Sequence, residues 1–399
     1  MSFWSLLSVA KVEVLFHPAD PTLEKIATWF QQAKHTIDIS MYDLETGTAS
    51  PVMAALADPA IQARLSSGAL SIRMIYEGYD TKQGNAKKMA QLEALGIDVR
   101  FVTSSKIVHH KFAVIDASLP ESRVVTGSAN WSLSSYRNYD ENVLFFEQEA
   151  FVTNGFETEF ELLWTHSTEF GVTKMHPVIN LPVTDVNPNI DLYFNSAKHI
   201  LKDASPEHSL PSQLIKQIGL AHTDLLIATT RARIIPVLES IRTAAERGVK
   251  IKILLSQDDF HDLAKRSQWL FNQPNIELRI KFYNLVPGNF MTYQMHNKFM
   301  IIDHQSVFTG SFNWSDSSQN YNIENVVLLK GAVAAAILPN FINRFDLLWK
   351  NGRDRLAQFQ NDLKTDQANH VVPLCAFAPI SLTFDEITTT LQLAPKCHN

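Results

Sequence analysis

The sequence predicts an α/β protein built from two similar α/β/α lobes that pack side by side. The chain has 399 residues, which is more than one ordinary domain needs. Stretches with the two-residue periodicity of strands alternate with stretches of helical periodicity, as is typical of α/β units with right-handed crossovers. The same series of segments then occurs a second time, so we expect one fold to be built twice.

Each half starts with a helix followed by a strand. Asp20 and Pro21 form a helix start, the apolar residues up to position 33 keep helical spacing, and residues 35–42 alternate as a strand. The next helix ends in glycine, which tolerates the left-handed backbone of a helix C-terminus. In the two halves the matching segments are helices before 35 and over 214–218, strands at 35–42 and 224–230, strands after a glycine at 70–76 and 249–255, strands at 97–102 and 276–280, and closing helices at 156–164 and 341–349.

The repeat divides the chain into domains. The stretch from Met175 to Asn189 is interrupted by prolines and has no periodicity, so we place a linker there. Residues after about Arg353 match nothing in the first half. We therefore predict a first lobe at 1–172, a linker at 173–190, a second lobe at 191–352 and a C-terminal tail of unknown role at 353–399.

The composition restricts the possible partners. Lys and Arg total 35 and Asp and Glu total 41, so the formal net charge is −6. Such a chain repels polyanions, and nucleic-acid binding would need a local basic patch. Cys375 and Cys397 provide neither a disulfide framework nor a zinc site, which makes a reducing compartment the default. Residues 3–10 are too short to span a bilayer and are expected to lead into a strand, and no later stretch is long and apolar enough, so we expect a soluble protein.

One polar motif occurs in both halves. It consists of His-x-Lys-x4-Asp, then Gly-Ser-x-Asn, then a glutamate. Its members are His109, Lys111, Asp116, Ser128, Asn130 and Glu141 in the first copy and His296, Lys298, Asp303, Ser311, Asn313 and Glu324 in the second.

The spacing of this motif suits phosphodiester chemistry. Residues i and i+2 of a strand point to the same face, so each His and Lys can address one shared pocket. A histidine near its reference pKa can act as nucleophile or proton donor, and lysine supplies positive charge to a phosphate oxygen. The serine and asparagine can donate hydrogen bonds to the same anion. A glutamate that accepts from the distal ring nitrogen would fix the histidine tautomer and raise its basicity.

Two such motifs in one chain resemble the phospholipase D superfamily, the HKD phosphodiesterases. The resemblance extends to about Trp349 and implies two α/β/α lobes in a pseudo-twofold arrangement. It also implies that one histidine attacks phosphorus to form a phosphohistidine, that the other protonates the leaving group, and that water or an alcohol releases the product without a metal or another cofactor. By this resemblance His109 is the nucleophile and His296 the acid, although the pseudo-symmetry leaves the order open. A monomer is sufficient, because each lobe supplies a half-site.

Other conspicuous residues are better explained by structure. Asp116 and Asp303 are motif members that are expected to close a strand and hold a turn rather than carry protons. His110 faces away from His109 and is expected to pack in the core, as are Trp131 and Trp314. The short basic cluster at Lys82, Lys87 and Lys88 is expected to be solvated surface, and the other short basic cluster, Lys265 and Arg266, lies near a loop of the second half.

The sequence leaves the substrate open. We predict hydrolysis of a glycerophospholipid head-group phosphodiester at a membrane surface, modestly ahead of a metal-independent endonuclease acting on nucleic acid, with a phosphatidyl transferase or a non-catalytic binding scaffold as further alternatives. The loop from Tyr283 to Tyr293, with Leu285 and Phe290, is a candidate for insertion into the lipid, and packing over its own lobe is the alternative. A cytoplasmic or peripheral membrane location is expected, and a secreted effector would have the same features.

Overall fold

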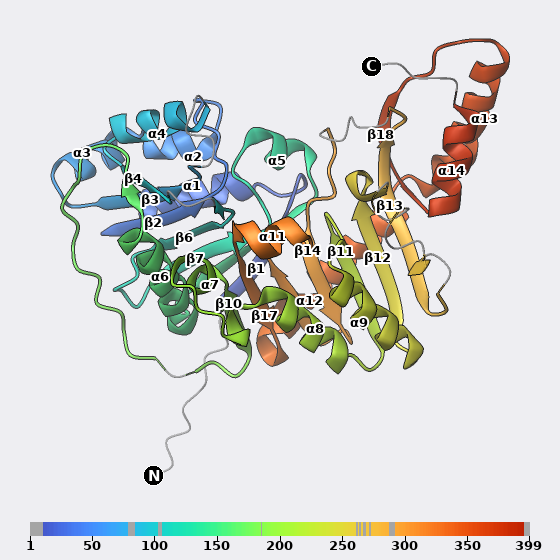
Figure 1. The fold of residues 1–399 in the computed structure, drawn as a ribbon. Coiled ribbons are helices and arrows are strands. Elements are labelled where there is room, and N and C mark those ends of the chain that lie inside the picture. Colours follow the sequence, from blue (N-terminus) through green and yellow to red (C-terminus); the bar gives the residue numbers. More distant parts are fainter. Residues whose placement is uncertain are drawn as a thin grey trace.

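Two lobes lie side by side in the computed structural model (Figure 1). The first lobe is drawn in blue and green, and the second runs from yellow-green to red. The structure describes residues 11–394 except 79–83, 103–105, 185, 261, 263–264, 266–268, 271–272 and 287–291.

The first lobe alternates strands and helices as the sequence predicts. Its elements are β1 (Lys11–His17), α1 (Thr22–Gln32), β2 (Thr36–Met41), α2 (Pro51–Leu56), α3 (Pro59–Ser66), β3 (Ser71–Tyr76), α4 (Gly84–Ala94), β4 (Asp98–Phe101), β5 (Ile107–Val108), β6 (Lys111–Ile115), β7 (Arg123–Gly127), α5 (Leu133–Asn138), β8 (Glu141–Glu147), α6 (Ala150–Thr165) and β9 (Thr168–Glu169).

The second lobe follows the same plan. Its elements are β10 (Ile190–Phe194), α7 (Ser196–Ile200), the 3-10 helix η1 (Pro206–His208), α8 (Leu210–Leu220), β11 (Asp224–Thr229), α9 (Ile235–Glu246), β12 (Lys250–Ser256), the 3-10 helix η2 (Gln257–Asp259), β13 (Ile276–Asn284), β14 (Lys298–Ile302), β15 (Ser306–Gly310), α11 (Asp316–Tyr321), β16 (Asn322–Ile323), β17 (Asn325–Leu329), α12 (Gly331–Lys350), the 3-10 helix η4 (Arg353–Arg355), α13 (Leu356–Ala368), β18 (Ala376–Leu382) and α14 (Phe384–Leu393).

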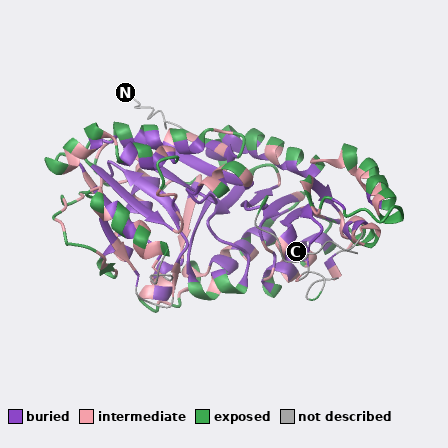
Figure 2. Ribbon diagram, turned by 90° about the horizontal axis from the view of Figure 1, so that it is seen from above, coloured by how far each residue is buried: buried purple, intermediate pink, exposed green. Residues whose placement is uncertain are grey.

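The two eight-stranded sheets have the same topology. Their strand orders are β1-β8-β7-β6-β2-β3-β4-β9 and β10-β17-β15-β14-β11-β12-β13-β18. In each sheet three neighbouring strands are parallel, namely β2, β3 and β4 and their counterparts β11, β12 and β13, and the remaining pairs are antiparallel. Helices flank the buried sheets and expose their outer faces, shown green in Figure 2. The predicted duplication of an α/β/α fold is confirmed.

The lobes share part of their hydrophobic core. One cluster of buried residues contains Phe112 and Phe156 of the first lobe together with Phe299 and Phe341 of the second. A parallel pair of short strands, β5 and β16, also joins the lobes, and the bridge from Asp140 to Met295 repeats this pairing on the other side. The interface is therefore built from core packing and backbone pairing, which fixes the relative position of the residues that meet there.

The predicted tail belongs to the second sheet. Its strand β18 pairs with β13 at the sheet edge, in the place that β9 occupies in the first lobe. The sequence shows no counterpart because β9 has two residues and β18 has seven. Cys375, just before β18, is disulfide-bonded, so a reducing compartment loses its support as the default. Within the described residues no helix is long and apolar enough to cross a membrane, and the predicted strand lead-in at 3–10 lies outside those residues.

Candidate active site

The two His-Lys pairs meet where the lobes join. Each pair lies at the start of a strand, β6 or β14, and backbone pairing across the interface positions it. His109 N donates to Ile323 O at 3.0 Å, and His296 N donates to Asp140 O at 3.0 Å. The four side chains are 1–8% exposed. The same-face geometry expected for each His and Lys is therefore realised in one buried polar cluster between the lobes, called the pocket below, in which the charges of Lys298 and His296 act on His109.

Each histidine is held by a glutamate from the opposite lobe. Nδ1 of His109 lies 2.9 Å from Oε2 of Glu324, and Nδ1 of His296 lies 2.5 Å from Oε1 of Glu141. The sequence predicts a glutamate on the distal ring nitrogen but does not indicate that the partners are exchanged. This contact leaves Nε2 of each ring as the nitrogen available for chemistry, because a carboxylate at Nδ1 fixes the tautomer.

The two motif serines support these glutamates and do not face the pocket. Ser128 Oγ donates to Glu141 at 2.7 Å, and Ser311 Oγ donates to Glu324 at 2.5 Å. Both serines are fully buried. The expectation that they bind the substrate anion is therefore wrong, since their hydroxyl protons are already engaged.

The glycine before each serine is needed for close backbone approach. A Cβ atom at Gly127 would lie 2.3 Å from the carbonyl oxygen of Asn142, and one at Gly310 would lie 2.2 Å from that of Asn325. No side chain fits at such distances. The Gly-Ser turn thus presses β7 against β8, and β15 against β17, and so positions the glutamate that precedes each asparagine.

The two motif asparagines keep free hydrogen-bonding capacity. Asn130 and Asn313 are 8% and 9% exposed, and the Oδ1 atom of each is buried without a hydrogen-bond partner among the described residues. Both of these atoms are acceptors, whereas an anion needs the Nδ2 donors, so the contact of these amides with a bound anion stays a prediction.

Burial weakens the charge of the two lysines. Lys111 Nζ donates to His109 O at 2.5 Å, and Lys298 Nζ donates to His296 O at 2.5 Å. Burial lowers the pKa of Lys111 to about 8 and that of Lys298 to about 7. An incoming phosphate would stabilise the charged form of both, because an opposite charge nearby raises the pKa of an ammonium group.

The histidines are neutral in the substrate-free pocket. Burial lowers the pKa of His296 to about 4 and holds that of His109 well below its ordinary value. The sequence expectation of a histidine near its reference pKa is therefore wrong for the free site. Neutral imidazole is the form that a nucleophile needs, whereas a proton donor must acquire its proton together with the anionic substrate.

The two supporting glutamates differ in charge. Burial raises the pKa of both, but at Glu141 the neighbouring His296 and Lys298 outweigh it, and its pKa lies below the ordinary value. Burial raises the pKa of Glu324 to about 7. At pH 7 Glu141 is therefore fully ionised and Glu324 only partly so, which breaks the near-symmetry of the two halves.

The motif aspartates lie at the far end of β6 and β14, away from the pocket. Asp116 accepts backbone hydrogen bonds from the residues that lead into β2, including His35 N at 2.7 Å. Asp303 does the same for the residues that lead into β11, including Thr223 N at 2.7 Å. Their position contradicts a catalytic role and agrees with the structural one.

Several predicted packing residues are confirmed in the core. His110, Trp131 and Trp314 are 0–1% exposed. Burial lowers the pKa of His110 to about 3, so this histidine is neutral as well.

Two aromatic residues of the pocket escaped the sequence analysis. The Tyr42 ring lies 4.7 Å from the His109 ring, and the Tyr139 ring lies 5.7 Å from the His296 ring. They belong to no repeated motif, and only the strand ends at which they stand, after β2 and before β8, could have indicated them.

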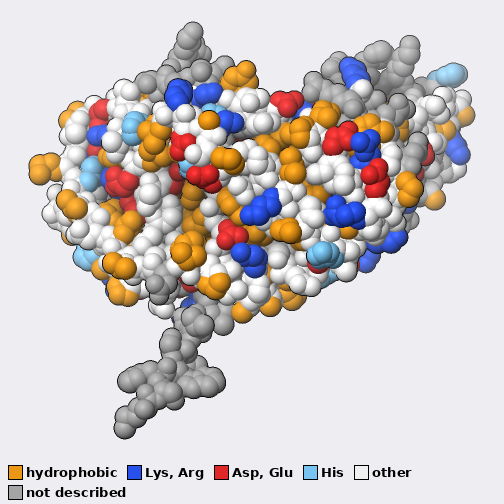
Figure 3. All heavy atoms as spheres, turned by 60° about the horizontal axis from the view of Figure 1, so that its bottom comes forward, with side chains coloured by type: hydrophobic (Ala, Val, Ile, Leu, Met, Phe, Trp, Pro, Cys, Tyr) orange, Lys and Arg blue, Asp and Glu red, His pale blue; other side chains and the backbone are white. Residues whose placement is uncertain are grey.

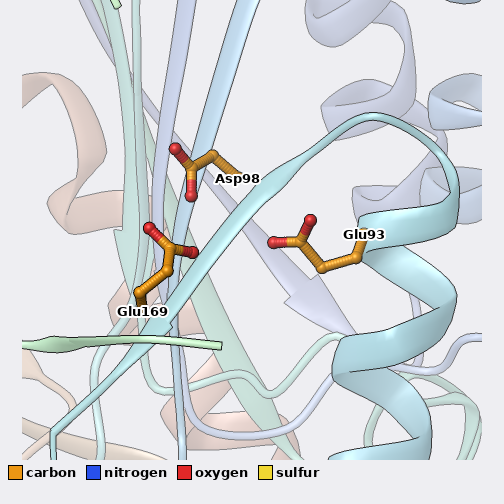
Figure 4. Close-up of side chains that lie close together, drawn as sticks. All are labelled: Glu93, Asp98 and Glu169. Carbon is orange, nitrogen blue, oxygen red and sulfur yellow. The ribbon is translucent and has the colours of Figure 1, made fainter. Parts of the chain in front are cut away.

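A separate group of carboxylates could hold a cation by distance alone (Figure 4). It consists of Glu93, Asp98 and Glu169, at the β4 edge of the first sheet. Each carboxylate already has a basic partner. Lys174 Nζ lies 2.7 Å from Glu93, His176 Nε2 lies 2.5 Å from Asp98, and Arg100 Nε lies 3.3 Å from Glu169. The group therefore fastens the segment after β9 to the first lobe.

The family model of the cardiolipin synthase, PLD-like domain, matches residues 26–164 and 214–349, more than half of the chain. The chain belongs to this phospholipase D-like family. The two matched segments cover both lobes and both motifs, so the resemblance inferred from the sequence is confirmed.

Relatives and solved structures within this family agree with the fold. Human mitochondrial cardiolipin hydrolase is 34% identical over 105 residues, 25% of this chain and 40% of the relative. Phospholipase D of Rickettsia typhi is 34% identical over 109 residues, 27% of this chain and 49% of the relative. The chain thus spans about half or less of these curated relatives. Phosphatidylserine synthase of Haemophilus influenzae has a TM-score of 0.62 at 12% identity and covers 84% of this chain and 85% of its own, a likeness of fold alone.

Proposed function

We propose that the protein is a phospholipase D-type phosphodiesterase with His109 and His296 as its reacting groups. The observation that carries this proposal is the exchange of supporting carboxylates, since each histidine comes from one lobe and its glutamate from the other. Two oriented imidazoles that share one pocket with two lysines meet the needs of a two-step phosphoryl transfer, which are a nucleophile, a proton donor and positive charge.

The reaction would proceed in two balanced steps. First, Nε2 of one histidine attacks phosphorus, the bond to the leaving alcohol oxygen breaks, and the other histidine gives that oxygen a proton. Second, the now neutral second histidine takes a proton from water, the resulting hydroxide attacks phosphorus, and the phosphorus–nitrogen bond breaks. Family resemblance favours His109 as the nucleophile, whereas the ionised Glu141 beside His296 supports the reverse order.

A glycerophospholipid remains the preferred substrate. The net charge is −6, and basic and acidic side chains are interspersed on the face shown in Figure 3. Of the basic clusters noted in the sequence, Lys88 is bound to Asp43 at 2.6 Å, while Lys82 and Arg266 lie outside the described residues. These features support a lipid ahead of a nucleic acid, which would favour a continuous basic groove. The names of the curated relatives place cardiolipin among the lipids to be tested.

A side-by-side assay tests the substrate proposal. Purified protein in EDTA is given liposomes of phosphatidylcholine, phosphatidylethanolamine or cardiolipin, and in parallel single-stranded DNA. We expect head-group or phosphatidylglycerol release from at least one lipid and no DNA cleavage. DNA cleavage without lipid turnover would make the protein a nuclease, and strict dependence on an added metal for the chemistry would contradict the paired-histidine mechanism.

The contact with the membrane needs a different loop from the one noted in the sequence. Leu285 is 5% exposed and packs in the second lobe, and Phe290 lies outside the described residues. Val372 and Leu374, just before β18, are both 77% exposed. They lie beside the C-terminal end of β13, because Leu285 N donates to Cys375 O at 2.8 Å. The site lies at the same end of the sheet, because β14 begins beside the C-terminal end of β11 and β11 runs parallel to β12 and β13. This loop can therefore enter the lipid while the pocket reaches its substrate.

Replacing both Val372 and Leu374 by Asp is expected to lower turnover of liposomes about 10-fold or more, since each buried aliphatic side chain contributes about 1.5 kcal/mol or more. Turnover of a soluble diester, bis(p-nitrophenyl) phosphate, should not change. The matched control replaces Met175 and Val178 by Asp as well. These two residues are 100% and 84% exposed and lie in the segment after β9. Equal losses in the two double variants, measured by liposome sedimentation and turnover, would remove the loop from the proposal.

A further inference from the structure

The pocket contains a charge that its near-symmetry does not predict. In each lobe the strand that pairs with the motif strand, β2 or β11, forms one further backbone hydrogen bond beyond its end. Tyr42 N donates to His110 O at 2.9 Å, and Thr230 N donates to Asn297 O at 3.0 Å. The next residues, Asp43 and Arg231, therefore occupy equivalent places. Counted along this register, position 43 falls opposite His109 and position 231 falls opposite His296.

These two equivalent residues differ in their partners. Asp43 is bound to Lys88 Nζ at 2.6 Å. The Arg231 guanidinium has no hydrogen bond or ion pair to any residue that the structure describes, and its Nε atom is buried without a partner. An unsatisfied buried donor is unfavourable unless a ligand completes it.

The two carboxylates of Asp258 and Asp259, on which the charge of Arg231 acts, are already engaged. Asp258 accepts from Ser256 Oγ at 2.9 Å and Gln294 Nε2 at 3.0 Å. Asp259 accepts from Ala232 N at 2.7 Å and Arg233 Nε at 2.5 Å. Neither carboxylate forms an ion pair with Arg231, although both feel its charge.

The guanidinium acts on the catalytic groups from this position. Burial and the charges of other groups have larger effects on the pKa of Lys298, and the positive charge of Arg231 lowers this pKa further. It also opposes the upward shift that burial and carboxylates impose on the pKa of Tyr42, whose ring contacts His109. Arg231 therefore stands close to both His-Lys pairs while it belongs to the second lobe alone.

We propose that Arg231 binds a non-bridging oxygen of the substrate phosphate, as a second-lobe cation whose first-lobe equivalent is Asp43. This inference rests on the proposed phosphodiesterase function and names a binding residue within that site. A planar guanidinium suits phosphate because it donates two parallel hydrogen bonds, which the point charge of lysine does not. In the first lobe the equivalent position holds Asp43, which is paired with Lys88, so among the described residues the two ester arms of the substrate meet different surroundings.

Inorganic phosphate provides a test that needs no turnover. Its affinity for the full-length protein is measured by calorimetry in wild type, Arg231→Gln and Arg231→Lys. The matched control is Arg233→Gln, two residues away, whose guanidinium is paired with Asp259 and Asp262. We expect phosphate affinity to fall 10-fold or more in Arg231→Gln, to fall less in Arg231→Lys, and to stay within about 2-fold in Arg233→Gln. With bis(p-nitrophenyl) phosphate the Arg231→Gln variant should raise KM more than it lowers kcat.

Three results would overturn the inference. They are no phosphate binding by wild type, unchanged affinity in Arg231→Gln with a wild-type melting temperature, and equal losses in Arg231→Gln and Arg233→Gln. Failure of the proposed function is a different result, in which wild type cleaves none of the phosphodiesters while the difference in phosphate affinity between the two arginine variants persists.

Discussion

Replacing either His109 or His296 by alanine is expected to lower phosphodiester turnover by a factor of about 10³ or more, because each substitution removes a nucleophile or a proton donor that the other histidine cannot supply. The effect should appear in kcat with a soluble diester as well as with liposomes. Both side chains point into a polar pocket between the lobes, so we expect the variants to fold. Their melting temperatures and circular dichroism spectra check this.

His110→Asn is the matched control for these two variants. His110 is adjacent to His109 and fully buried, but it faces Ser40 and Phe112 rather than the pocket. The second lobe has Asn297 at the equivalent position, so the substitution is one that this fold already accommodates. Turnover within about 10-fold of wild type is expected for the control. Substantial turnover by His109→Ala or His296→Ala would contradict the paired-histidine mechanism.

The duplicated fold could be predicted because it depends on local patterns. Hydrophobic periodicity, glycine at helix ends and the repeated motif are all written within short windows of sequence. The edge strand β18 was not predicted, because its counterpart β9 is only two residues long and carries no pattern. A pairing of that kind is set by the sheet that is already formed rather than by the strand itself.

The residue types of the site could be predicted, but their partners could not. The spacing from His109 to Glu141 is compatible with a contact inside one lobe, and nothing local distinguishes this from a contact between lobes. The exchange is decided by the shared core and by the pairing of β5 with β16, which set the lobes against each other. The same assembly buries Ser128 and Ser311 behind the glutamates, so a polar residue beside a motif does not by itself indicate contact with substrate.

Burial of the assembled pocket also explains why the titration of the site could not be predicted. Reference pKa values describe solvated groups, whereas here burial is the first cause of the shifts at His296, Lys298 and Glu324. A phosphate that enters this pocket finds donors with weakened charge, and its own negative charge restores their protonation. Substrate binding and charging of the site are therefore expected to be coupled.

Glu141→Gln is expected to lower kcat by about 10²- to 10⁴-fold, through the histidine of the other lobe, because an amide holds the ring without stabilising its cation. The sign of the accompanying pKa change follows from the contact. The ionised Glu141 is the strongest charge that raises the pKa of His296, whereas burial, Lys111, Lys298 and His296 all act on the pKa of His109 more strongly than Glu141 does. Losing that charge must lower the pKa of His296 below its value of about 4 and change that of His109 much less.

Nuclear magnetic resonance of the imidazole Nδ1 protons distinguishes the two histidines. In Glu141→Gln the His296 signal should move or vanish, because the carboxylate 2.5 Å from its Nδ1 atom is replaced by a neutral amide. The His109 signal should persist, because that ring is held by Glu324. Glu324→Gln is the reciprocal control and should affect His109 instead. A Glu141→Gln spectrum in which His109 changes and His296 does not would show that the glutamates act within their own lobes, and the cross-lobe site would then have to be abandoned.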